Sequence, residues 1–217
     1  MGITHFATLS DGTHVEVLNS FRKHEMKLAR LQRKLSKKQK LSSNWQKQKR
    51  KLQKHHRKIA NVRKDFLHKL STTISENHAM VVMEDLQIKN MSRSASGTIE
   101  QPGRNVSAKR GLNKAILDQG WFEFRRQLTY KLTWRGGKLI AVPPQYTSQT
   151  CNHCGHIDKA NRKTQAQFIC TACGFEVNAD CNAALNILAA GHAVTFGGVG
   201  KAQAPTMKQK PAYGAAR

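Results

Sequence analysis

The chain has 217 residues, of which 37 are Lys or Arg and 13 are Asp or Glu, so its formal net charge is +24. This length allows one domain, or one domain with a small module, and excludes a large multidomain enzyme. Such an excess of positive charge favours a polyanionic partner, and nucleic acid is the commonest one. The chain contains no run of about 18 apolar residues, so we expect no membrane-spanning segment.

The first twenty residues predict a β-hairpin, with strands over residues 3–9 and 14–18. Ser10-Asp11-Gly12-Thr13 supplies the turn, because Asp-Gly between β-prone runs is a strong hairpin signal. Residues 1–20 are therefore expected to contribute the opening strands of the fold.

Residues 22–69 predict an antiparallel helical hairpin with a strongly basic surface. They carry 19 Lys and Arg residues against two acids, and they contain no Gly or Pro. Two narrow apolar seams have the heptad spacing of packed helices, and Leu41-Ser42-Ser43-Asn44 separates them with a turn and an N-cap. The seam positions are Phe21, His24, Leu28, Leu31, Leu35, Leu52, His55, Ile59, Val62 and Phe66.

The surface of this hairpin is the expected nucleic-acid interface, because so much positive charge repels itself unless a polyanion neutralises it. The candidate phosphate-binding residues are Lys37, Lys38, Lys47 and Lys51. A solvated charged hairpin without any ligand stays open as the alternative.

The rest of the chain alternates strands with helices, which is the pattern of an α/β fold. Ala79-Met80-Val81-Val82-Met83 is a short apolar run typical of a buried strand. A Ser- and Gly-rich segment at residues 88–104 predicts a mobile loop, and residues 121–134 predict a helix that stops at Gly136-Gly137. The remaining expected elements are a strand over residues 139–142, a helix over 181–190 and a disordered tail from residue 191.

Four of the five cysteines form two pairs, Cys151/Cys154 and Cys170/Cys173, separated by fifteen residues. This spacing supplies four thiolates for a tetrahedral structural zinc ion. A redox-active C-x-x-C motif explains one pair but not both, and the odd number of cysteines favours a reducing compartment over a secreted disulfide framework. His153 and His156 are alternative ligands, and Cys181 is expected to be a small buried residue.

Two acidic residues are candidates for chemistry. Glu84 follows the predicted buried strand, at the edge of a sheet where open α/β folds bind ligands. Asp180 comes directly before the predicted last helix. A structural alternative stays open for each: Glu84 as a turn residue that ends the strand, and Asp180 as a helix N-cap.

Three blocks of sequence together resemble the OrfB/TnpB family of insertion-sequence proteins, which are often called transposases. The first block runs from Gly2 to Gly12, and the second is Met83-Glu84-Asp85-Leu86 with Lys89-Asn90-Met91. The third joins residues 147–155, 170–174 and 178–187. The resemblance covers nearly the whole chain to Ala190.

This resemblance implies an α/β, RNase H-like (RuvC-like) mixed sheet with a basic helical-hairpin insertion and a small zinc ribbon. It implies an RNA-guided, magnesium-dependent DNA endonuclease of the prokaryotic cytoplasm and nucleoid, with DNA and guide RNA as partners. The implied divisions are a truncated opening hairpin at 1–20, the basic hairpin at 21–77, the RuvC-like domain at 78–146, the zinc ribbon at 147–177, a closing RuvC-like segment at 178–190 and a disordered tail at 191–217.

The resemblance also assigns roles to the acids, and one is missing. Glu84 and Asp180 correspond to the second and third of three magnesium-binding carboxylates in the family. The first is the Asp of a Gly-Ile-Asp-x-Gly block, and Gly2 corresponds to its last glycine, so that Asp would immediately precede Met1. Asp11 cannot replace it, because nine residues of extended strand span about 30 Å.

We therefore expect a truncated nuclease half that is inactive alone. One alternative is a non-cleaving nucleic-acid-binding protein that assists or antagonises a full-length relative. Another is a zinc-ribbon RNA-binding protein of the ribosomal kind, which fits the charge but does not explain the family context of the two acids.

Overall fold

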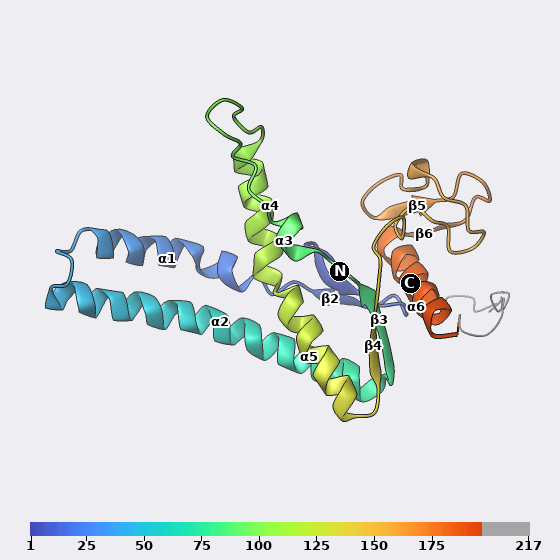
Figure 1. Cartoon of the computed structure of the whole chain (residues 1–217), viewed down its shortest axis with the longest axis horizontal. Helices are drawn as coiled ribbons and strands as arrows, with labels where there is room; N and C mark the ends of the chain where they lie inside the picture. Colours follow the sequence, from blue (N-terminus) through green and yellow to red (C-terminus); the bar gives the residue numbers. More distant parts are fainter. Residues whose placement is uncertain (197–217) are drawn as a thin grey trace, which may run out of the picture.

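A computed structural model of the protein describes residues 1–196 (Figure 1). The helices are α1 (Ser20–Ser36), α2 (Ser43–Asn77), α3 (Ile88–Met91), α4 (Val106–Gln119), α5 (Trp121–Trp134) and α6 (Ala179–Phe196), with a 3-10 helix η1 (Lys159–Asn161). The strands are β1 (His5–Thr8), β2 (His14–Glu16), β3 (Met80–Glu84), β4 (Lys138–Val142), β5 (Gln167–Ile169) and β6 (Glu176–Asn178). None of the helices in the described range combines the length and apolarity that crossing a bilayer demands.

The strands of the described residues form three separate two-stranded sheets, so the predicted single mixed sheet is wrong. β1 and β2 are antiparallel, β3 and β4 are parallel, and β5 and β6 are antiparallel. The chain ahead of β1 turns back, with the Gly2 N–H donating to the Phe6 carbonyl at 3.3 Å, so β1 is short and does not run along β3. β1 and β3 instead share a core, into which Phe6 and Met83 are buried.

The main core lies where α2, α5, β1 and β3 meet. The Phe6 ring packs edge-on against Phe66 and Phe124, with ring centroids 5.3 and 5.0 Å apart. The other large buried side chains there are Leu67, Ile74, Met83, Ile116, Trp121, Leu128 and Leu132. This core joins the base of the helical hairpin to the sheet of β3 and β4, so the hairpin is anchored to the rest of the fold.

The basic helical hairpin is confirmed as α1 and α2, and it extends to one side of the molecule as a long arm (Figure 1). The N-cap predicted within residues 41–44 is Ser42, since its hydroxyl accepts the Trp45 backbone N–H at 3.2 Å. Val62 is wrong as a seam position because it is 38% exposed. The rings of His24 on α1 and His55 on α2 pack edge-on, which sets the register of the two antiparallel helices. In this register Val62 lies beyond the first residue of α1, so no residue of α1 covers it.

Two boundaries differ from the sequence prediction. The predicted loop at 88–104 contains the short helix α3, and α4 follows it at a place where no helix was predicted. The tail predicted to begin at residue 191 is wrong in its first residues, because α6 continues to Phe196. Gly191 allows α6 to approach β3 closely: a Cβ at Gly191 would lie 2.3 Å from Val82 Cγ2. Residues 197–217 of the predicted tail lie outside the described residues.

The first turn of α1 is capped by Asp118, which comes from the end of α4. The Asn19 side chain makes no capping bond there. The Asp118 carboxylate is buried and accepts the Ser20 hydroxyl at 3.0 Å, the Phe21 N–H at 2.9 Å and the Arg22 N–H at 3.3 Å. This contact over 98 positions fixes the base of the hairpin to the core.

Replacing Asp118 with Ala should therefore destabilise the protein, because the buried Ser20 hydroxyl and the N–H groups at the start of α1 lose their acceptor. We expect a loss of about 1–3 kcal/mol in the free energy of unfolding, measured by denaturant titration. Asp65→Ala is the control, because Asp65 is exposed and makes only an i,i+4 pair with Lys69, so it should change stability by less than about 0.5 kcal/mol. Equal stability of the two variants would contradict the capping role.

Candidate functional site

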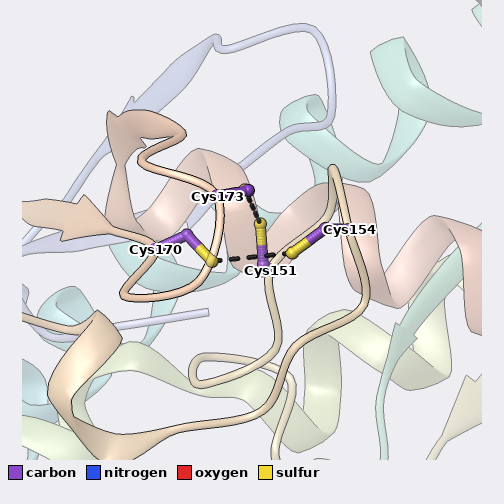
Figure 2. Close-up of side chains that lie close together, drawn as sticks. All are labelled: Cys151, Cys154, Cys170 and Cys173. Atoms are coloured by element: carbon purple, nitrogen blue, oxygen red, sulfur yellow. Dashed lines mark hydrogen bonds between the residues drawn. The ribbon is translucent and has the colours of Figure 1, made fainter.

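The four paired cysteines converge on one point (Figure 2). Their sulfur atoms all lie within 4.8 Å of one another, with Cys151 Sγ 3.8 Å from Cys173 Sγ and Cys154 Sγ 3.6 Å from Cys170 Sγ. A tetrahedral zinc with Zn–S bonds of about 2.3 Å needs sulfur–sulfur separations of about 3.8 Å, whereas a disulfide needs about 2.05 Å. The cluster therefore fits one metal ion such as zinc, held by sulfur alone.

The backbone of each cysteine pair is shaped to stabilise thiolates. Gly155 and Gly174 follow the pairs with φ of +78° and +71°, a conformation that suits glycine. Burial raises the pKa of Cys151 to about 12. Burial also acts to raise the pKa of Cys170. Hydrogen bonds from backbone N–H groups, including the N–H of Cys173, outweigh this effect and lower the pKa of Cys170 to about 6. A metal ion that binds this cluster must displace the remaining protons, so its affinity depends on pH.

Asn161, at the end of η1, joins the two halves of the zinc ribbon. Its side chain is fully buried, and its Nδ2 donates to the carbonyls of Gln149 at 2.9 Å and His156 at 3.3 Å. Its Oδ1 accepts the N–H and the hydroxyl of Thr171 at 2.8 and 3.0 Å. Sequence reasoning missed this residue, because a single asparagine between two cysteine pairs follows no periodicity.

Asparagines on α6 attach the ribbon to the rest of the fold. The side chains of Asn182 and Asn186 both donate to the Thr150 carbonyl at 2.7 Å. Asn182 Oδ1 also accepts the Asn152 N–H at 3.0 Å. These bonds hold the first cysteine pair against the first turns of α6, where Asp180 lies.

Glu84 and Asp180 line one pocket of about 330 Å³, although they are 96 positions apart in the chain. Glu84 ends β3 and Asp180 begins α6. Each carboxylate faces a cation: Glu84 Oε2 lies 3.2 Å from the amino group of Met1, and Asp180 Oδ1 lies 3.6 Å from Arg162 Nη2. The structure thus brings the two predicted acids to one pocket.

The interpretation of Asp180 as the helix N-cap is wrong. Asn178 caps α6 instead, because its Oδ1 accepts the N–H groups of Asp180 at 2.9 Å and Cys181 at 3.2 Å. Asp180 therefore does not cap the helix, and it lines the pocket that it shares with Glu84. Arg162, which the sequence analysis did not single out, lines the same pocket.

The four candidate lysines lie near the closed end of the hairpin, and all are exposed. Lys37 and Lys38 follow α1, while Lys47 and Lys51 are in the first turns of α2. Residues 26–64 contain 16 Lys and Arg residues and no acid. The surface therefore carries unneutralised positive charge along most of the arm.

Comparison with known proteins places the chain in a family. The family OrfB_IS605, "Probable transposase", matches residues 1–95, and "Cas12f1-like, TNB domain" matches residues 121–187. "Putative RNA-guided DNA endonuclease InsQ" of Escherichia coli (strain K12) is 60% identical over 210 residues, which cover 97% of this chain and 52% of that protein. The chain belongs to the OrfB/TnpB family.

A second relative of this OrfB/TnpB chain is the "Putative RNA-guided DNA endonuclease" of Streptomyces pristinaespiralis, 35% identical over 92% of this chain and 46% of that one. The chain spans about half the length of the curated relatives it matches. Among solved structures, the cryo-EM structure of the Cas12f1-sgRNA-target DNA complex aligns with a TM-score of 0.50 and 24% identity, over 81% of this chain and 43% of that one. This likeness shows a shared α/β fold.

The cysteine cluster predicts one zinc ion per chain. Cys154→Ser should lower the zinc content measured by mass spectrometry, and a chelator should raise hydrogen exchange first in residues 147–177, because structural zinc contributes folding free energy directly. Cys181→Ser is the matched control, since Cys181 is buried but lies outside the cluster. Full zinc content in Cys154→Ser would contradict the assignment.

Proposed function

We propose that this chain carries the nuclease part of an RNA-guided DNA endonuclease of the TnpB kind. The observation that supports this most is the common pocket of Glu84 and Asp180. The relatives are named as RNA-guided DNA endonucleases, and the similar solved chain is in a complex with guide RNA and target DNA. DNA and a guide RNA are therefore the proposed partners, in the prokaryotic cytoplasm.

In this proposal Glu84 and Asp180 hold magnesium. Carboxylate oxygens are the ligands that Mg²⁺ prefers, and the ion keeps several waters when only one or two carboxylates bind it. Bound magnesium supplies charge stabilisation and water activation for phosphodiester hydrolysis. Arg162 Nη2 lies 3.6 Å from Asp180 Oδ1, so an incoming ion must compete with Arg162 for Asp180.

The zinc ribbon has a structural role in this proposal. Four thiolates complete a closed tetrahedral site, which leaves no position for water or substrate. The ribbon contributes by holding the start of α6, through the Asn182 and Asn186 bonds to Thr150. Its effect on the chemistry is to position Asp180.

Among the described residues, two acids line the pocket, Glu84 and Asp180. The family resemblance implies three magnesium-binding carboxylates. Two carboxylates can hold one hydrated ion but do not fix a pair of ions about 3.5–4 Å apart. We therefore propose that residues 1–217 alone bind nucleic acid without cutting it. The second candidate function, a non-cleaving protein that assists or antagonises a full-length relative, is favoured by the same observation.

Magnesium binding tests the pocket separately from cleavage. Calorimetric titration should detect weak Mg²⁺ binding that Glu84→Gln and Asp180→Asn each remove, while Glu176→Gln, an exposed acid on β6, leaves it unchanged. With DNA added, we expect no magnesium-dependent cleavage by residues 1–217. Cleavage that is lost in Glu84→Gln would contradict the incomplete site, and unchanged binding in both pocket variants would contradict the pocket itself.

The basic hairpin should bind the nucleic-acid backbone with little sequence preference. Because phosphate contacts release counterions, log K should fall linearly with log salt, by about 0.7 to 0.9 per phosphate neutralised. Changing four lysines to Gln should weaken binding and flatten this slope by about 3 if each neutralises one phosphate. The lysines to change are Lys37, Lys38, Lys47 and Lys51.

A control with the same change in net charge uses four exposed lysines outside the hairpin. These are Lys89, Lys138, Lys159 and Lys163. Fluorescence anisotropy measured from low to moderate salt should give this control a steeper slope than the hairpin variant. Equal slopes would show that the hairpin faces solvent.

A further inference from the structure

The closed end of the helical hairpin carries two apolar side chains within its basic surface. Leu41, in the turn, is 70% exposed, and Trp45, in the first turn of α2, is partly exposed. The arm holds this end away from the sheets and the zinc ribbon (Figure 1). Apolar side chains displayed at the end of a projecting arm point to a partner outside the described chain.

The backbone at Leu41 makes this display unusual. Its φ is +68°, in the left-handed region where glycine or asparagine is the usual residue. A branched apolar side chain at such a position is disfavoured, and so exposed a leucine gains little from packing to offset the strain. The leucine is therefore explained better by a contact outside the hairpin than by the stability of the turn.

Trp45 follows four residues later, in the first turn of α2. Its N–H donates to the Ser42 hydroxyl at 3.2 Å, which caps α2 and fixes the backbone of this turn. Lys49 Nζ lies 5.1 Å from the centre of the Trp45 ring, so a cation covers part of the ring. The Trp45 ring therefore lies next to positive charge.

The charge around the two side chains indicates what they contact. Exposed lysines surround them, and no acid occurs from residue 26 to residue 64. The surrounding lysines are Lys37, Lys38, Lys40, Lys47 and Lys49. A partner must therefore offer a flat apolar surface among closely spaced negative charges, which is what a nucleobase flanked by phosphates provides.

We propose that Leu41 and Trp45 form a stacking wedge that contacts the open face of a nucleobase where a nucleic-acid duplex ends or opens. Proteins that insert apolar side chains between bases combine them with nearby Lys and Arg in this way. The proposal rests on the proposed function, because it requires the hairpin to bind nucleic acid. An RNA strand and a DNA strand offer the same base face, so both are tested.

The probe is an oligonucleotide duplex with one unpaired strand, in RNA and in DNA, carrying fluorescent 2-aminopurine as the first unpaired base. Binding of the full chain should change the 2-aminopurine fluorescence. Trp45→Ala should abolish this change and weaken binding roughly 5- to 150-fold, whereas Trp45→Phe should keep most of both. The matched control is Trp134→Ala, since Trp134 is 77% exposed on α5, outside the arm, and should have no effect.

Leu41→Gly separates a binding role from a structural one. Glycine relieves the positive φ, so the melting temperature should stay equal or rise while binding to the probe weakens. A lower melting temperature with unchanged binding would show that Leu41 serves only the turn, and would overturn the wedge.

The remaining outcomes distinguish the wedge from the function on which it rests. If Trp45→Ala and Leu41→Gly bind the probe as the unchanged chain does, while the four-lysine variant binds more weakly, the wedge is wrong and backbone binding stands. If the unchanged chain does not bind either probe, both proposals fail. If Trp45→Ala weakens binding of polyglutamate instead, without a fluorescence change on the probe, the two side chains serve an acidic protein and the wedge is overturned.

Discussion

The close contact between α6 and β3 places Glu84 and Asp180 along one pocket. At Gly191 the helix touches Val82 so closely that no Cβ fits, and Asp180 lies eleven residues earlier on the same helix, about 16 Å along its axis. Glu84 is fixed by the parallel ladder that sets it opposite Val142 of β4. A larger residue at position 191 would push the helix from the strand and change the separation of the two acids.

The zinc ribbon holds the other end of the same helix. Ala179, the first residue of α6, donates its N–H to the Ala166 carbonyl at 2.8 Å, and the side chain of Asn182 bonds to the carbonyl next to Cys151. A metal site without an open position can therefore influence the acidic pocket by geometry alone.

Turn residues and local composition were sufficient to locate α5 and the basic hairpin from the sequence. Gly120 and Gly136, both with φ of +73°, enclose α5, and the composition of the basic segment defined the hairpin. The pattern of apolar residues did not reveal α4, because Ile116 is the one buried apolar side chain of this helix whereas Leu112 and Leu117 are exposed. Contacts such as Asp118 with the start of α1 join segments 98 positions apart, so no local pattern reveals them. The cysteine spacing was informative because four thiolates at fixed intervals have few other uses.

The 35 residues of α2 connect the arm to the core as one continuous helix. Its first half packs on α1, its second half is buried against α5 through Leu67 and Ile74, and β3 with Glu84 follows within a few residues. A helix of this length spans about 50 Å, so the closed end of the hairpin and the core keep a fixed separation.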